Sequence, residues 1–280
     1  MPTEFTPLTA LGGGALIGLA AALLMLGNGR IAGISGILGR LLPPWQGADG
    51  DRLPRLAFLA GLIAAPLLLS WSGLWALPAA VLPGGGALMA AAVLLVGIGT
   101  TLGSGCTSGP GAPVEALARG HPDVHGHRHR HGLRPAPPAG RRAMMRSLVA
   151  LASGLLFGAG LLVSGMIQPA KVLNFLDLAG AWDPSLALVM AAALAVTFAG
   201  YRLAFRRPAP LFDTQFHLPT SQALDARLLL GAALFGVGWG LGGYCPGPAL
   251  AAAGGLAEGT LIFLAAFLAA TAATRLLTAR

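Results

Sequence analysis

Two short motifs set a cysteine among glycines and prolines, GSGCTSGPG at 103–111 and GGYCPGPA at 242–249. Glycine lets a chain leave helical geometry and proline stops the helix from re-forming at once, so each motif predicts a break in a helix. The N–H groups of such a turn, followed by the start of a short helix, form a positive concavity that suits an anion. Sulfur is soft and a weak hydrogen-bond partner, so the thiols of Cys106 and Cys245 would contact a sulfur-bearing anion without holding it tightly.

The two motifs occupy equivalent positions in a long internal repeat. GIGTTLGSGC at 97–106 lies over GVGWGLGGYC at 236–245, with glycines and the cysteine in register. Upstream, LIGLAAALLMLGNGRIAGISGIL resembles LFGAGLLVSGMIQPAKVLNFL after a shift of one or two residues. We therefore predict a solute path built from both copies. Its candidate residues are Gly105, Cys106, Thr107, Ser108, Tyr244, Cys245, Pro246 and Gly247. The ordinary alternative is that each thiol is only a small buried hydrophobe, and capture of a soft metal ion is a further one.

The composition places these motifs in a membrane. Of 280 residues, 55% are hydrophobic and 10% are charged, against roughly 25% charged in a soluble domain. The net charge of +8 does not indicate nucleic-acid binding, because the basic residues lie between apolar segments, where they act as orientation signals. The sequence predicts an all-α integral membrane protein.

Apolar runs long enough to cross the bilayer predict seven transmembrane helices. They span 9–27, 56–77, 85–104, 147–165, 185–205, 223–242 and 259–277. Four shorter pieces bounded by glycine or proline, at 31–42, 107–119, 169–180 and 246–257, predict re-entrant half-helices. Such pieces usually line a path through the protein, and interfacial helices are the alternative.

Alternating the loops across seven crossings puts nearly all basic residues on one side. That side holds Arg30, Arg40, Arg52, Arg55, Arg119, the cluster from 128 to 146, Arg202, Arg206, Arg207, Arg227, Arg275 and Arg280. The other side holds Lys171. The positive-inside rule then predicts a multi-pass inner (plasma) membrane protein with its N-terminus outside and its C-terminus in the cytoplasm.

The predicted domains are a first transmembrane repeat at 1–119, a cytoplasmic linker at 120–146, and a second repeat at 147–280 that carries an extra C-terminal helix. Each half has three crossings before its cysteine motif. Because three is an odd number, the second copy enters the membrane upside down, and the repeat is predicted to be inverted. Secondary transporters bind their substrates at the interface between such repeats.

A second group of candidate residues follows the first crossing of each half. SGMIQPAKVLNFLD at 164–177 holds Lys171, which either attracts an anion, pairs with Asp177, or extends its ammonium group to the interface. GNGRIAGISG places Arg30 and Ser35 at related positions, where they would form a cytoplasmic counterpart.

The linker segment HPDVHGHRHRHGLRPAPPAGRR at 121–142 holds five histidines. Histidine-rich tracts bind metals, but a flexible, soluble linker needs no more than this charge and proline content. The sequence has no Ser/His/Asp triad, no phosphate-binding loop and no paired carboxylates spaced for acid–base work. We therefore expect no cofactor, no resident metal and no enzymatic activity.

The chain resembles the YeeE/YedE family of sulfur-transport membrane proteins over nearly its whole length, in a form that fuses two halves. The resemblance rests on RIAGISGIL, GSGCTSGPG, SGMIQPAKVLNFLD and GYCPGPA. It implies passage of a thiosulfate-like ion, with Cys106 and Cys245 making transient thiol contacts to its terminal sulfur. The form of the third motif is closer to a two-part subfamily associated with sulfide or sulfite. Some members carry a further cysteine near the first half-helix, and this sequence has none there, so a three-thiol relay is not expected.

The leading hypothesis is a membrane transporter of a small sulfur-containing anion. A membrane sulfurtransferase that carries a persulfide to a cytosolic sulfur-accepting protein, and a soft-metal permease, are the alternatives. The expected partners are the anion and the lipid bilayer, with no nucleic acid. The ion, the direction of transport and the oligomeric state stay open.

Overall fold

The computed structural model describes residues 3–43, 52–78, 86–103, 139–218 and 225–278. Its long helices are α1 (Pro7–Asn28), α3 (Arg52–Trp71), α4 (Gly86–Leu102), α6 (Ala139–Val163), α8 (Ser185–Ala204), α9 (Ala226–Gly242) and α11 (Glu258–Thr278). The short ones are α2 (Ile34–Gly39), α7 (Pro169–Leu176), α10 (Pro246–Ala252) and the 3₁₀ turn η3 (Ala253–Gly255). The fourth predicted half-helix, at 107–119, lies outside the described residues.

Among the described residues, five helices are each long and apolar enough to cross a membrane: α1, α3, α6, α8 and α11. A sixth span forms if α9 and α10, which meet at an angle of 43°, count as one broken crossing. The remaining long helix, α4, is apolar but shorter. The prediction of an all-α integral membrane protein is confirmed, and the protein is a multi-pass membrane protein.

Two boundaries differ from the predicted ones. Helix α3 ends at Trp71 rather than at 77, because the following turn places Gly73 in the left-handed region at φ +73°. Helix α6 begins at Ala139, well before the apolar run that starts at 147. Its first turns carry arginines, since the helix needs backbone hydrogen bonds and not apolar side chains to extend beyond the membrane.

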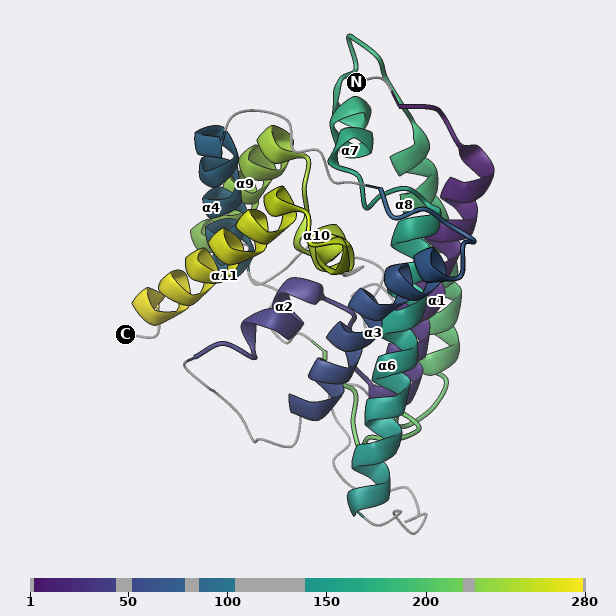
Figure 1. The fold of residues 1–280 in the computed structure, drawn as a ribbon. Helices are drawn as coiled ribbons and strands as arrows, with labels where there is room; N and C mark the ends of the chain where they lie inside the picture. Colours follow the sequence, from purple (N-terminus) through teal and green to yellow (C-terminus); the bar gives the residue numbers. More distant parts are fainter. Residues whose placement is uncertain (1–2, 44–51, 79–85, 104–138, 219–224, 279–280) are drawn as a thin grey trace.

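The two halves pack as an inverted repeat, with corresponding helices antiparallel. In the α1–α6 pair, Gly13 lies against Ser164, and Gly27 lies against Val149. In the α4–α9 pair, Gly99 lies against Phe235 and Gly103 lies against Gly231. Figure 1 shows α4 and α9 side by side. Glycine at these contacts lets two helix backbones approach closely, as in many membrane bundles.

Exchanging the halves maps several further helix contacts onto one another, as a two-fold axis requires. Helix α1 corresponds to α6, and α3 corresponds to α8. Helix α3 packs along α6, and α1 packs along α8 in the same way. The short elements obey the same relation, since α2 touches α4 and α7 touches α9. The α3–α6 and α1–α8 contacts join one half to the other, so the apolar core is shared between the two repeats.

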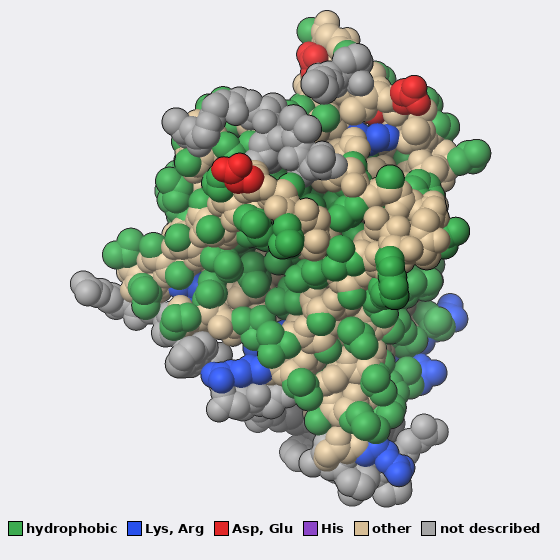
Figure 2. Space-filling model, viewed as in Figure 1, with side chains coloured by type: hydrophobic (Ala, Val, Ile, Leu, Met, Phe, Trp, Pro, Cys, Tyr) green, Lys and Arg blue, Asp and Glu red, His purple; other side chains and the backbone are tan. Residues whose placement is uncertain are grey.

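Charges separate to opposite ends of this bundle (Figure 2). The start of α1 and the segment after α7 carry the carboxylates Glu4, Asp177 and Asp183. The opposite end collects the end of α1, the starts of α3 and α6 and the end of α8. Its basic residues include Arg30, Arg52, Arg55, Arg141, Arg142, Arg146, Arg202, Arg206 and Arg207. The asymmetry that the loop alternation predicted is therefore present in the fold.

Candidate functional site

Cys245 lies at the break between α9 and α10. The thiol-bearing residue has extended backbone (φ −111°, ψ 151°) immediately before Pro246, the first residue of α10. Its side chain is buried. Helix α10 is itself buried along almost its whole length and packs against α2, α3, α6 and α11. The predicted half-helix is confirmed, and it holds Cys245 inside the bundle.

The backbone turn before Cys245 requires glycine. Gly243 ends α9 in the left-handed region at φ +62°, which side chains other than glycine rarely adopt. A Cβ atom there would lie 2.8 Å from the Pro169 carbonyl oxygen and 2.6 Å from Leu173 Cγ. The turn that precedes the thiol therefore rests directly on α7.

Tyr244 and Gly247 fix the two sides of this turn. The buried Tyr244 hydroxyl lies 3.3 Å from Thr260 Oγ1 of α11. Its ring packs edge-on against Phe263 at 5.0 Å. On the other side, Gly247 faces α2, since a Cβ atom there would lie 2.8 Å from Ile34 Cδ1. The break is thus held between α11 and the half-helix of the first repeat.

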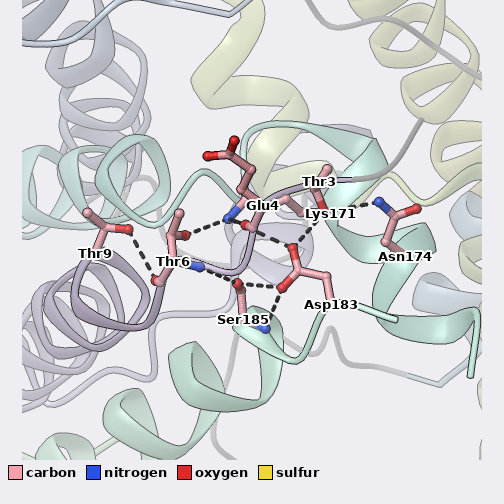
Figure 3. A network of polar contacts seen from close by, with 8 residues as sticks. All are labelled: Thr3, Glu4, Thr6, Thr9, Lys171, Asn174, Asp183 and Ser185. Carbon is pink, nitrogen blue, oxygen red and sulfur yellow. Dashed lines mark hydrogen bonds and ion pairs between the residues drawn. The ribbon is translucent and has the colours of Figure 1, made fainter. Parts of the chain in front are cut away.

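A buried polar network surrounds Lys171 at the carboxylate-rich end (Figure 3). The Lys171 ammonium donates to Thr6 Oγ1 at 2.7 Å and to the Glu4 carbonyl oxygen at 3.3 Å. It forms an ion pair with Asp183 at 4.0 Å. Only 8% of Lys171 is exposed, so its ammonium group does not extend into the interface. The suggested partner Asp177 is exposed, and the structure pairs Lys171 with Asp183 instead.

Asp183 is the centre of hydrogen bonding in this network. Ser185 donates to Oδ1 through its hydroxyl at 2.6 Å and through its backbone N–H at 2.9 Å. Thr3 donates its hydroxyl to Oδ2 at 2.6 Å and accepts a bond from Asn174 Nδ2 at 3.0 Å. The residues come from the N-terminal segment, α7 and the start of α8. No sequence-local pattern marked Asp183, because Thr3 reaches it from the other repeat.

The two charges in the network have shifted pKa values. Burial lowers the pKa of Lys171, although the carboxylates of Asp183 and Glu4 act in the opposite direction. Burial alone would raise the pKa of Asp183, but the hydrogen bonds from Ser185 and Thr3 and the charge of Lys171 together lower it.

The related positions in the first repeat lie at the arginine-rich end. Ser35 is buried in α2. Arg30 follows the left-handed Gly29 at the end of α1, is half-buried, and forms an isolated backbone bridge with His217. Gly29 also accepts a backbone hydrogen bond from His217 at 2.8 Å. The segment after α8 therefore returns to cover the end of α1.

A cluster of charged side chains fixes that returning segment, and no motif in the sequence pointed to it. Asp213 lies 3.3 Å from Arg146 Nη2 and 3.1 Å from His217 Nε2. The carbonyl oxygen of Arg146 accepts a bond from Asn28 Nδ2 at 2.9 Å. The cluster joins the start of α6 to the end of α1.

The first cysteine motif, with Gly105, Cys106, Thr107 and Ser108, lies outside the described residues. The five histidines of the linker, at 121–131, lie outside them as well, whereas the last linker residues form the start of α6. Within the described ranges, no group of three or more His, Cys, Asp or Glu side chains is arranged to hold a metal ion.

Comparisons with known proteins identify relatives named as transporters. Residues 145–280 match a family described as of unknown function, DUF6691. A "Probable transporter" from Xylella fastidiosa (strain Temecula1 / ATCC 700964) is 51% identical over 126 residues, which cover 45% of this chain and 85% of the relative. A second from the same strain is 44% identical over 110 residues, which cover 39% of this chain and 76% of the relative. No solved structure matches the chain.

Each match covers most of the relative but less than half of this chain, so these relatives are about half as long as this chain. The counterpart from strain 9a5c of the same organism is also 51% identical and 86% covered. Similarity at this level over most of a protein's length establishes common family membership. The chain therefore belongs to the same family as these probable transporters from Xylella fastidiosa.

Proposed function

We propose that the protein carries a small sulfur-containing anion across the inner membrane, with thiosulfate as the first candidate and sulfite or sulfide as the others. The path would run between the two repeats past Cys106 and Cys245. Transporter relatives support the transport function in general and favour a carrier over an enzyme. The sulfur-containing cargo rests on the resemblance to the YeeE/YedE family and on the chemistry of the thiol.

The position of Cys245 is the observation that carries the proposal. The thiol is buried at the break of a membrane span, beside half-helices from both repeats. Non-helical backbone at membrane depth is tolerated where protein or a water-filled cavity surrounds it, and in transporters it borders the substrate site. A soft sulfur atom at this point offers a contact that a sulfur-bearing anion makes and readily leaves.

The charge separation supports one orientation in the membrane. The arginine-rich end would face the cytoplasm and the end with Lys171 would face outward. An anion would then meet Lys171 before it reaches the thiol. Cysteine substitution combined with single-side thiol labelling would determine which end faces outward.

The proposal is tested by replacing the Cys245 thiol while keeping its volume. Uptake of ³⁵S-labelled thiosulfate into vesicles should be abolished by Cys245→Ser and by Cys245→Ala, and also by Cys106→Ala. The double variant Cys245→Ala/Ala249→Cys returns a thiol to α10 at another buried position, and it should not restore uptake.

Membrane insertion and a monodisperse elution profile in detergent provide the folding control for each variant. Full uptake by Cys245→Ser would remove the thiol from the mechanism. A stable persulfide on Cys245 in mass spectrometry, together with no uptake by the unmodified protein, would favour the sulfurtransferase instead.

A further inference from the structure

We infer that the Lys171 network is an anion-recognition site whose resident occupant is the carboxylate of Asp183, and that a small oxyanion displaces this carboxylate on binding. That the transported anion enters the protein at this site rests on the proposed function. The site itself is defined by Lys171, Thr3, Thr6 and Ser185, which surround Asp183 at the carboxylate-rich end (Figure 3).

The donors around Asp183 have the arrangement that an oxyanion needs. Two hydroxyl groups and one backbone N–H donate to its two oxygens, at 2.6, 2.6 and 2.9 Å. The Lys171 ammonium adds a positive charge at 4.0 Å. Thiosulfate, sulfite and sulfate carry several acceptor oxygens, so the same hydroxyl, amide and ammonium donors would bind them.

Lys171 is paired loosely with Asp183 for a buried ammonium group. Its shortest contact is to the neutral hydroxyl of Thr6 at 2.7 Å, while the carboxylate oxygen lies at the limit of an ion pair. Charged N–H donors usually approach a carboxylate to about 2.7–2.9 Å. An anion that lies closer to the Lys171 ammonium than Asp183 does would therefore be attracted more strongly by the same positive charge.

The cover of this site is a short segment that can be displaced at little cost to the core. Thr3 and Thr6 belong to the extended residues before α1, and the side chains of Glu4 and Phe5 between them are exposed. The segment is tied down by the polar contacts to Lys171, Asp183 and Ser185. Binding that replaces Asp183 would also release the contact between Asp183 and Thr3.

Helix α7 connects this site to the turn before Cys245. Lys171 lies on α7, and Pro169 and Leu173 of the same helix contact Gly243. Gly243 is separated from Cys245 by one residue. An anion released from Lys171 would thus start within one short helix of the thiol.

The test measures binding of thiosulfate, and of sulfate as a second oxyanion, to the purified full-length protein by isothermal titration calorimetry. Asp183→Asn keeps the size and an acceptor oxygen but removes the competing charge, so it should tighten binding about tenfold. Lys171→Gln should weaken binding about tenfold or more, because a neutral amide replaces the ammonium. Asp177→Asn is the matched control: it removes an exposed carboxylate from the same end and should leave affinity within about twofold.

Unchanged affinity in both Asp183→Asn and Lys171→Gln, or weaker binding in Asp183→Asn, would overturn the inference. A purely structural network predicts that second result, since the substitution would only loosen the site. If Lys171→Gln alone is not monodisperse, the double variant Lys171→Gln/Asp183→Asn removes both charges, and it should bind more weakly than Asp183→Asn. Vesicle uptake separates the two claims. If uptake depends on Cys245 but the affinity changes are not seen, the proposed function stands and this anion site is disproved. If the affinity changes are seen but the protein takes up no thiosulfate, the anion site stands and the proposed function is disproved.

Discussion

Half-helices α2 and α7 occupy the same place in the two repeats, yet one buries a hydroxyl group and the other buries a charge. Each follows a left-handed glycine, Gly29 at φ +64° and Gly165 at φ +73°. Six residues beyond those glycines lie Ser35 and Lys171, exposed by 9% and 8%. The two repeats therefore share this backbone turn but differ in the side chain that they bury. Only the copy at the carboxylate-rich end has Asp183 beside it to balance a buried ammonium.

The largest effect is expected when α2 receives a lysine at position 35, which corresponds to Lys171 of α7. Ser35→Lys would bury an ammonium group on α2, one turn before Gly39, whose Cβ position lies 3.5 Å from Arg275 Nη1. An unbalanced buried charge of this kind costs about 3 kcal/mol or more. We expect a large fall in the thermal unfolding midpoint in detergent.

Ser35→Ala is the control for that substitution and should change stability by less than about 1 kcal/mol. A Ser35→Lys protein as stable as the unmodified one would show that the two half-helices tolerate charge equally. The difference between the repeats would then have no energetic basis.

A smaller effect is expected when the two left-handed glycines are replaced by alanine. A side chain in that region costs roughly 1 kcal/mol at either position. Gly29→Ala should cost more than Gly165→Ala. Its Cβ would meet Pro210 and lie 2.9 Å from the Gln215 carbonyl oxygen, whereas the Cβ at Gly165 would meet the Lys171 side chain at 3.2 Å. Chemical or thermal unfolding of both variants would rank them.

Gly33→Ala is a matched control, because no atom lies within 4 Å of its Cβ position and its φ is −109°. Equal losses for Gly29→Ala and Gly165→Ala would mean that the segment around Pro210 moves aside. The returning segment at the arginine-rich end would then be held less firmly than its backbone hydrogen bonds suggest.

The smallest expected effect is a dependence on acid that only the α7 end should show. The folded-state pKa of Asp183 lies below its ordinary 3.8, so the unfolded chain takes up the proton first as the pH falls. The network's contribution is therefore complete above pH 3.8 and is lost as the pH falls through the lower folded-state pKa. Unfolding midpoints between neutral and acidic pH should decline less steeply for Asp183→Asn. Parallel curves for the two proteins would contradict this.

The sequence predicted the helices well because lipid imposes strong rules on length and polarity. Apolar length located the long helices, and Gly-Pro boundaries located α2, α7 and α10 at their observed starts to within a few residues. The shared cysteine motif and the odd number of crossings predicted the inversion, which the antiparallel α1–α6 and α4–α9 pairs confirm. Each of these signals is local or periodic, so a single sequence carries it.

The polar partners could not be predicted in the same way. Thr3 and Asp183 are 180 residues apart and meet because the N-terminal segment of one repeat crosses the start of α8 in the other. Asp177, the residue that follows α7, is nearer to Lys171 in sequence than Asp183 is, but it is exposed. Asp213 likewise reaches Arg146 through a loop whose path follows from tertiary packing.

The extensive helix contacts of this protein run between the repeats: α3 with α6, α1 with α8, α4 with α9 and α1 with α6. In the described part of the chain, each half packs its long helices mainly against the other half, so each would expose apolar faces if synthesised alone. Two separately translated halves should assemble as an obligate heterodimer, with the covalent link serving to fix their stoichiometry. Relatives about half as long as this chain would need a partner subunit, or a second copy of themselves, to complete the same bundle.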